Sequence, residues 1–430
     1  MSESNWAGNY IYRADKLHRP SGLEQVQEII ANAPRVRVLG SRHSFTDIAD
    51  SSELLTLDGL PADIVADHEA GTISFSAGLR YGEVTEALRV ESVALPNLAS
   101  LPHISVAGAV ATASHGSGDA NGNLATTVAG LEIVLSSGEI LTSSRGDADF
   151  NGLVVGLGAL GAITRLTLDV EPAYHVRQRV FEGLGWDALF ENFDEITSAG
   201  YSVSVFTRWS EAIDQVWVKS RATEAPEPLR GDLFGAIAAT VDRHPILGLD
   251  PVNCTPQMGA AGLWSDRLPH FRMGFTPSSG RELQSEYLVP RRHAPAAIQA
   301  VRALSDAIQP VLQVSEIRTV AADGLWMSPQ YGEDTVAIHF TWEREMDAVT
   351  GVIADIEGAL APFEARPHWG KVFGADAASI ASLYERLPDF TRLAGRLDSR
   401  GAFRNAWLNT RVLGMNDRVG RAHTARPPRR

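Results

Sequence analysis

The sequence predicts an α+β protein built from two domains, and three observations support this prediction. The chain has 430 residues, which is longer than most single domains. Short strand patterns with few helices fill the chain as far as Pro172, whereas longer alternating strands and amphipathic helices follow it. The composition is 44% hydrophobic and 21% charged, which is typical of a globular protein and excludes a disordered or collagen-like chain.

The first block, residues 1–172, begins with a helix that Pro34 ends, and Ser21 with Glu24 matches a capping box at its start. A strand over residues 35–39 then leads directly into a loop over residues 40–44. One further helix is predicted over residues 82–91. Further strands are predicted over residues 54–57, 72–77, 131–135, 140–142 and 163–170.

The second block, which follows Pro172, has the pattern of a sheet covered by helices on one face. Its strands are predicted over residues 201–209, 215–219, 313–320 and 335–342, and its helices over residues 186–198, 295–308 and 348–360. Residues 223–231 are predicted to form a surface loop, and the basic, proline-rich residues 417–430 a disordered tail.

The charge balance and the cysteine content narrow the possible partners. The net charge of −14 repels nucleic acid and anionic lipid, so we expect neither as a partner. No apolar run is long enough to span a membrane, and the polar start lacks the pattern of a secretory signal. The single cysteine, Cys254, cannot form an internal disulfide, so we expect a free thiol in a reducing cytoplasm.

Several common functional motifs are absent from the sequence. It contains no Walker phosphate loop, which argues against a P-loop nucleotidase, and no GxSxG nucleophile elbow, which argues against a hydrolase. It also contains no HExxH motif, so we expect no bound metal. Residues 156–161 spell GxGxxG but lead into a predicted strand, so we do not interpret them as a dinucleotide fingerprint.

Two segments have the small residues that allow a backbone to approach a ligand closely. Residues 100–118 carry no acidic or basic side chain other than histidine and consist mainly of Ala, Gly, Ser and Val. They could bind a flat or anionic ligand, or form a tightly packed, turn-rich part of the core. The loop over residues 40–44 is a second candidate, and its His43 could be a base, a ligand, a covalent attachment point or a histidine bonded to backbone.

Strand spacing brings polar residues of the second block onto common faces. Side chains alternate along a strand, so Glu316 and Arg318 share one face, and His339 and Thr341 share another. Residues 367–371 add His368 and Lys371. A pocket of such donors and acceptors suits a neutral, polyhydroxylated substrate, although Glu316 and Arg318 could instead form a salt bridge on a solvated face.

Six strings, in this order, resemble the alditol and xylitol oxidases. These enzymes are a bacterial branch of the vanillyl-alcohol-oxidase-type flavoenzymes, which hold FAD covalently. The resemblance runs from residue 5 to about residue 413. The strings are VRVLGSRHSF (36–45), LPNLASLPHISVAG (95–108), FTPSSG (275–280), LQSEY (283–287), EIRTVAAD (316–323) and RPHWGK (366–371).

The resemblance implies a fold and a cofactor site. The fold would comprise a PCMH-type FAD-binding domain (1–172), a cap domain for the substrate (173–400) and a C-terminal return to the first domain (401–416). His43 would be linked to the 8-methyl carbon of the flavin ring. The other FAD contacts implied are Val38, Leu39, Gly40, Ser41, Arg42, Ser44, Ser100, Ser105, Gly108, Thr112, Ala113, Ser114, His115, Gly118 and Ile163.

The resemblance also implies a reaction. The enzyme would oxidise the terminal hydroxyl of an acyclic polyol such as xylitol or sorbitol to the aldose, with O2 reduced to H2O2, as a cytoplasmic monomer. Arg318, Lys371 and His339 would be catalytic. The substrate would contact Ser100, Glu316, Arg318, Thr341, His368 and Lys371. Two alternatives remain: a sugar-lactone oxidase or dehydrogenase of the same superfamily, and a flavin-binding protein without catalytic activity.

Overall fold

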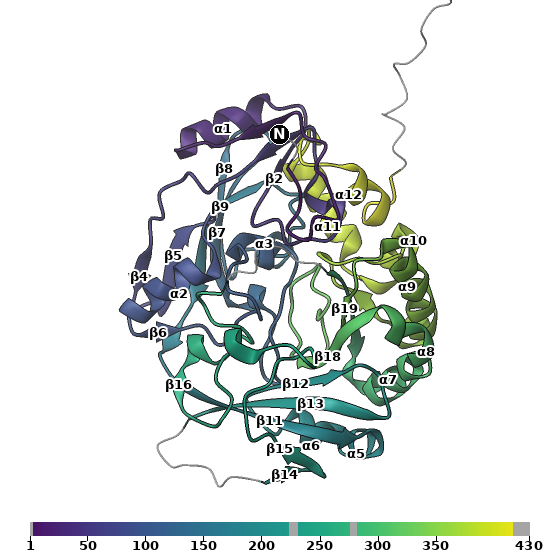
Figure 1. Ribbon diagram of the computed structural model, residues 1–430. Helices are drawn as coiled ribbons and strands as arrows, with labels where there is room; N and C mark the ends of the chain where they lie inside the picture. The colour runs from purple at the N-terminus through teal and green to yellow at the C-terminus, as the bar shows by residue number, and fades with distance from the viewer. Residues whose placement is uncertain (1–2, 223–230, 276–281, 416–430) are drawn as a thin grey trace, which may run out of the picture.

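The computed structural model describes residues 3–222, 231–275 and 282–415 and confirms an α+β fold of two packed blocks (Figure 1). The predicted loop over residues 223–231 and tail over residues 417–430 lie almost entirely outside the described residues. Within the described residues, no helix is both long and apolar enough to cross a membrane.

The first block contains a parallel sheet in the order β1-β3-β2 and an antiparallel sheet in the order β4-β5-β9-β7-β8. Its strands are β1 (Lys16–His18), β2 (Val36–Val38), β3 (Glu53–Leu55), β4 (Val65–Asp67), β5 (Thr72–Ser76), β6 (Val93–Ala94), β7 (Val128–Val134), β8 (Ile140–Ser144), β9 (Ala162–Asp169) and β10 (Glu171–Pro172). Its helices are α1 (Leu23–Asn32), α2 (Tyr81–Val90), α3 (Val106–Ala111) and α4 (Phe150–Leu153).

Local sequence explains two of these elements and corrects one prediction. Strand β9 buries every second residue, as its alternating sequence predicts. Helix α1 buries Val26 and Ile30, which lie four residues apart on one face. The capping box predicted at Ser21 is wrong: Gly22 is the N-cap and makes no side-chain cap, while the side chain of Gln25 accepts the Ser21 N–H.

The second block is built on a ten-stranded sheet in the order β14-β15-β11-β13-β12-β18-β19-β17-β20, with β16 paired to β11. Its strands are β11 (His175–Gly185), β12 (Ser202–Thr207), β13 (Ala212–Arg221), β14 (Asp232–Leu233), β15 (Ala236–Ala238), β16 (Gly262–Leu263), β17 (Leu283–Pro290), β18 (Leu312–Val320), β19 (Thr335–Trp342) and β20 (Arg366–Pro367). The long strands β11 and β17 were not predicted from the sequence.

Helices cover one face of this sheet, as predicted, and pack on an apolar cluster that includes Ile317, Ile338 and Phe340. The helices are α5 (Trp186–Glu191), α6 (Phe193–Thr197), α7 (Ala294–Arg302), α8 (Ser305–Ile308) and α9 (Met346–Leu360). Two predicted single helices are each split: α5 and α6 are separated at Asn192, and α7 and α8 are separated by residues 303–304.

The opposite face of the sheet is polar where it meets the first block. Strand register places Glu316, His339 and Glu286 directly opposite one another on β18, β19 and β17. Arg318 and Thr341 lie two residues along their strands and therefore share this face. The fold thus gathers five chemically active side chains from three strands in one place.

The C-terminal helices return to the first block earlier than the predicted residue 400. They are α10 (Ala377–Leu383), α11 (Leu387–Leu397) and α12 (Ala406–Arg411), and Figure 1 shows α11 and α12 in yellow near the N-terminal segment. Trp369 and Phe390 already belong to the hydrophobic core of the first block. The Asn405 side-chain amide then donates to the backbone carbonyls of Asp47, Ile48 and Asp50.

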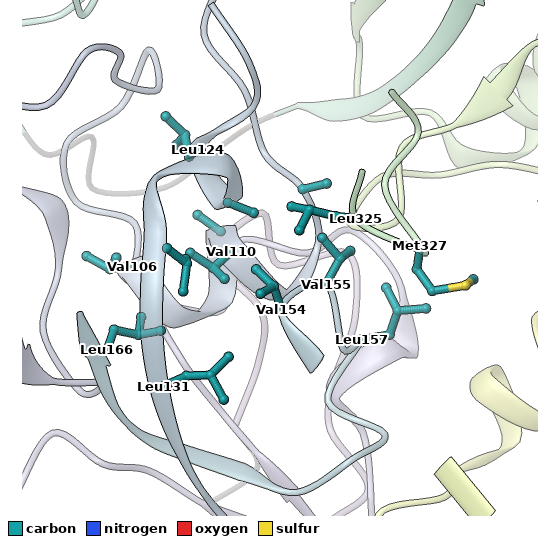
Figure 2. Close-up of a cluster of buried hydrophobic side chains, with 14 of the residues drawn as sticks. Val106, Val110, Leu124, Leu131, Val154, Val155, Leu157, Leu166, Leu325 and Met327 are labelled. Carbon is teal, nitrogen blue, oxygen red and sulfur yellow. The ribbon is translucent and has the colours of Figure 1, made fainter. Parts of the chain in front are cut away.

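The core of the first block also incorporates side chains from the second. Figure 2 shows Leu325 and Met327, which follow β18, packed beside Val154, Val155 and Leu157. All five side chains are at least nine-tenths buried. This shared core fixes the polar face of the large sheet against the first block.

Candidate functional site

A cavity of about 580 Å³ lies where the two blocks meet. One wall comes from residues 37–45, helix α3 with its flanking residues, and residues 156–163 of the first block. The other wall is the polar face of the large sheet, together with residues 368–371. This volume is within the range of cofactor and small-molecule sites, so the cavity is the candidate active site.

Glycines bring the backbone of the first wall close together. A Cβ atom on Gly40 would lie 2.4 Å from the Ser105 hydroxyl oxygen, and one on Gly108 would lie 2.6 Å from it. The Ser105 N–H donates to Ser41 Oγ at 2.8 Å, which ties the 40–44 loop to the start of α3. Because both glycines line the cavity, backbone rather than side chain forms this part of its surface.

His43 lies in an aromatic environment at the cavity. Its Nδ1 is 3.1 Å from Ser41 Oγ, whereas its Nε2 is buried and has no hydrogen-bond partner among the described residues. The Trp6 ring stacks on the imidazole at 5.0 Å, and the His103 ring lies 4.5 Å away, between centroids. Burial, assisted by the neighbouring His103, lowers the pKa of His43 to about 3, so the ring is neutral at pH 7.

The GxGxxG-like segment forms another part of the first wall. Residues 156–161 lead into β9, as predicted, yet most of them line the cavity. Buried Arg37 holds them by donating to the carbonyls of Gly158 at 2.8 Å and Leu157 at 2.7 Å. Gly161 has a φ of +150°, and a Cβ there would lie 2.3 Å from the Ile133 side chain, so only glycine fits.

This first wall fits FAD. It offers backbone exposed by glycines, an unsatisfied buried imidazole nitrogen and surfaces of small residues, as a flat dinucleotide requires. The predicted FAD contacts that line the cavity are Val38, Leu39, Gly40, Ser41, Arg42, His43, Ser44, Ser100, Ser105, Gly108, Thr112, Ser114, His115 and Ile163. Ala113 and Gly118 are not among the described residues that line it: Ala113 is in the core, and Gly118 N–H bonds to Thr319 on β18.

On the second wall, Glu286 joins the two cations predicted to be catalytic. Its Oε1 accepts from Arg318 Nη2 at 2.7 Å, and its Oε2 accepts from Lys371 Nζ at 2.6 Å. His115, from the first block, lies 3.4 Å from Oε1. Lys371 Nζ is also 2.8 Å from His339 Nδ1, and His339 Nε2 is 3.1 Å from Thr341 Oγ1.

Burial and pairing oppose one another in this cluster. Burial raises the pKa of Glu286, but the charges of Lys371, His115 and Arg318 outweigh it and hold that pKa well below its ordinary value. For Lys371, burial wins over the attraction of Glu286 and lowers the pKa. Burial likewise lowers the pKa of His339, which is therefore a neutral imidazole.

The predicted substrate residues lie together at the cavity. Glu316 and Arg318 are 5% and 6% exposed, so the alternative of a salt bridge on a solvated face is wrong. Arg318 Nε lies 3.5 Å from Glu316 Oε2. The full predicted set lines the cavity: Ser100, Glu316, Arg318, His339, Thr341, His368 and Lys371.

Sequence reasoning missed several residues of the site. Glu286 was not among the predicted site residues, although Gln284 and Glu286 are two residues apart and so share one face of a strand. Lys219 and His270, which lie behind Glu316, belong to segments with no recognisable motif. Trp6 and His103 reach His43 only through tertiary contacts.

Two protein-family models match different parts of the chain. A model described as an FAD binding domain matches residues 14–144. A model described as D-arabinono-1,4-lactone oxidase matches residues 276–411.

Similar proteins cover nearly the whole chain. An alditol oxidase of Streptomyces sp. (strain IKD472 / FERM P-14339) is 48% identical over 416 residues, which span 96% of this chain and 99% of that protein. An L-gulono-1,4-lactone dehydrogenase of Mycobacterium tuberculosis is 28% identical over 430 residues, again 96% and 99% of the two chains. The crystal structure of cholesterol oxidase from B. sterolicum superposes with a TM-score of 0.77 over 95% of this chain and 96% of that one, at 15% identity. The last comparison supports the fold alone.

Proposed function

This chain belongs to the alditol oxidase family, and from that premise we propose that it oxidises the terminal primary hydroxyl of acyclic polyols such as xylitol and sorbitol to the aldose, with O2 reduced to H2O2. The observation that carries this proposal is the placement of Arg318, Lys371 and His339 opposite the wall that fits FAD. A hydroxyl bound there would face cations and a neutral base together.

The chemistry that bound FAD would supply is acceptance of a hydride from the alcohol carbon and transfer of the electrons to O2. We propose that His43 Nε2 is the point of covalent attachment, since it is buried, neutral and without a partner among the described residues. With Nε2 free for attachment, the hydrogen of the neutral ring is on Nδ1, which donates to Ser41 Oγ. Trp6 fixes the plane of the ring by stacking on it. His43 is thereby oriented before attachment.

Arg318 and Lys371 would stabilise negative charge on the substrate oxygen as its proton leaves. Glu286 holds both cations through separate carboxylate oxygens, so they are positioned before the substrate arrives. The buried carboxylate also offsets part of the cost of placing two positive charges in a closed site. Glu316 and Thr341 remain to bind other hydroxyls of the substrate.

His339 is the proposed proton acceptor, and its position beside Lys371 refines that role. Nδ1 lies 2.8 Å from Lys371 Nζ, and Nε2 contacts Thr341. The hydroxyl proton can reach Nδ1 only when the Lys371 ammonium turns its N–H toward the substrate oxygen instead. Lys371 and His339 would therefore act together: Lys371 stabilises the alkoxide while His339 accepts the proton.

A peroxide-linked substrate screen tests the proposed function. Purified protein is incubated with xylitol, sorbitol, L-gulono-1,4-lactone and D-arabinono-1,4-lactone, and H2O2 is measured for each. The proposal predicts peroxide from both polyols at kcat/KM values at least about tenfold above those of the lactones, the discrimination that one hydrogen bond supplies. Equal or better oxidation of a lactone would contradict it.

Lactone oxidation is the second candidate, because the lactone oxidase model matches the part of the chain that supplies the second wall. A sugar lactone has a carbonyl and a ring oxygen where an open-chain polyol has two hydroxyls, and these two oxygens only accept hydrogen bonds. The wall instead contains the ionised carboxylate of Glu316, whose Oε2 can accept a further hydrogen bond from a substrate hydroxyl. This chemistry favours a substrate with many hydroxyls.

A further inference from the structure

A row of three side chains lies behind the second wall of the cavity. Lys219 Nζ on β13 is 3.2 Å from His270 Nδ1, and His270 Nε2 is 2.8 Å from Glu316 Oε1 on β18. Their exposed fractions are 1%, 6% and 5%. His270 and Glu316 line the cavity, whereas Lys219 does not, so the row runs from the protein interior to the surface that a substrate would meet.

The chemistry of Lys219 is unusual for this chain. Of the 38 basic residues only three are lysines, Lys16, Lys219 and Lys371. Lys219 is buried and Lys371 is part-buried, and both lie around the same polar face. An ammonium is compact and directs three donors, whereas a guanidinium is broad and planar. Lys219 Nζ uses its donors on His270 and on the carbonyl of Leu268.

Packing holds the imidazole of His270 in one orientation. The rings of Trp217 and Phe206 meet it edge-on at 5.2 and 5.4 Å between centroids. Its backbone carbonyl accepts the Thr255 N–H at 2.9 Å, and Thr255 in turn accepts from buried Gln178. The ring therefore cannot rotate away from Lys219 and Glu316 without breaking this packing.

The hydrogen bonds in the row run in one direction. Arg318 and His270 together outweigh the effect of burial and keep the pKa of Glu316 low, so its carboxylate only accepts. His270 must then carry its hydrogen on Nε2, which leaves Nδ1 as an acceptor for Lys219. Burial lowers the pKa of Lys219 to about 7 and that of His270 to about 4, and an amine can donate to Nδ1 in either protonation state.

One oxygen of Glu316 remains available at the cavity. Oε1 is used by His270, while Oε2 lies 3.5 Å from Arg318 Nε. That Nε is buried and has no hydrogen-bond partner among the described residues. A hydroxyl can accept from Arg318 Nε and donate to Glu316 Oε2 at once, whereas a carbonyl or ether oxygen can only accept.

We propose that Lys219 and His270 are positioning residues that fix Glu316 as an acceptor and so make the site select a substrate hydroxyl, rather than a carbonyl or ring oxygen, beside Arg318. This inference rests on the proposed function, because it assigns Glu316 and Arg318 to substrate binding. It extends that function by naming two residues that determine the substrate class through Glu316: His270, which lines the cavity, and Lys219, which does not.

Kinetics with two substrates test the proposal. Xylitol is compared with 1,5-pentanediol, which has the same chain length but only terminal hydroxyls. In Lys219→Met the xylitol KM should rise by about 10- to 100-fold, the range for a lost hydrogen bond to a charged group, while kcat changes less. The ratio of kcat/KM for xylitol to that for the diol should fall by a similar factor.

Two further variants separate positioning from packing. Lys219→Gln keeps an N–H donor toward Nδ1 and should recover part of the xylitol KM, whereas His270→Gln should reproduce the Lys219→Met effect with Lys219 present. Lys16→Met, an exposed lysine on β1, is the matched control and should leave both substrates unchanged. An unaltered KM for xylitol in either Lys219→Met or His270→Gln overturns the proposal. An equal rise of this KM in Lys219→Met and Lys219→Gln also overturns it.

The tautomer of His270 gives a readout independent of turnover. Nitrogen NMR of protein with labelled histidine, assigned through His270→Gln, should show a protonated Nε2 and a bare Nδ1. In Lys219→Met the Nδ1 resonance should move, because this nitrogen loses its donor, while Glu316 still holds the hydrogen on Nε2. If the unmodified protein forms no peroxide from any polyol, the proposed function fails, but this NMR measurement still tests whether Lys219 holds His270. An Nδ1 resonance that stays in place without Lys219 would show that Lys219 does not hold His270, and would overturn the proposal.

Discussion

The two walls of the cavity are made in opposite ways. The first wall is shaped by missing side chains, because Gly40, Gly108 and Gly161 allow close approaches that any Cβ would block. The second is shaped by side chains that strand register places in rows, such as Glu316 beside His339. The comparison teaches that one wall exposes backbone, as the proposed contact with a cofactor requires, and that the other presents side chains, as the proposed chemistry on a substrate requires.

Replacing His43 by Ala should give the largest effect, on the first wall alone. Since His43 Nε2 is the proposed attachment atom, covalent flavin should fall from nearly all of the protein to none. The measurement is flavin absorbance in the acid-precipitated, washed polypeptide. His68→Ala, at an exposed histidine paired with Glu91, is the control. Flavin that stays with the His43→Ala polypeptide would refute the attachment.

Replacing Lys371 by Met should affect the second wall alone. Removing one preorganised donor to a developing oxyanion typically costs about 10²- to 10³-fold in turnover, and we expect that loss for kcat with xylitol. Covalent flavin should remain at the level of the unmodified protein. If turnover were unchanged, Lys371 would have no part in the mechanism.

Replacing Glu286 by Gln should shift the pH dependence of the second wall. Lys371 must be charged to stabilise an alkoxide, so activity is lost as pH rises through its pKa. Burial already lowers that pKa and Glu286 raises it. Without the carboxylate, the alkaline limb of kcat should move to lower pH by about 1–3 units, the range for one opposite charge. A limb that stays in place or moves to higher pH would show that Glu286 does not support Lys371.

Replacing Gly161 by Ala should have the smallest effect and should sharpen the contrast between crowded and open positions. At a φ of +150° the new Cβ would press on the Ile133 side chain and on the backbone carbonyl of Val134, and cost about 1–3 kcal/mol of unfolding free energy. Gly358→Ala in α9 meets nothing within 4 Å and should add about 0.5–1 kcal/mol. Urea unfolding of both variants provides the measurement. Equal changes would mean that the first wall is not tightly packed.

Much of the fold could be predicted because short-range patterns record it. The alternation in residues 163–170 predicts β9, and the spacing of Val26 and Ile30 is that of a helix face. Predictions failed where local sequence is ambiguous. Asn192 interrupts a helical pattern without proline or glycine, and β17 is buried on both faces, so its sequence lacks strict alternation.

The sequence by itself determined which residues can do chemistry: the His43 loop, the uncharged 100–118 segment and the polar positions on β18 and β19. Only the tertiary structure decided that Glu286 joins Arg318 to Lys371, and that Lys219 reaches Glu316 through His270. The physical reason is the distance along the chain over which each effect acts. Side-chain alternation acts over two residues of one strand, whereas a hydrogen bond depends on a few tenths of an ångström between strands that lie far apart in the chain.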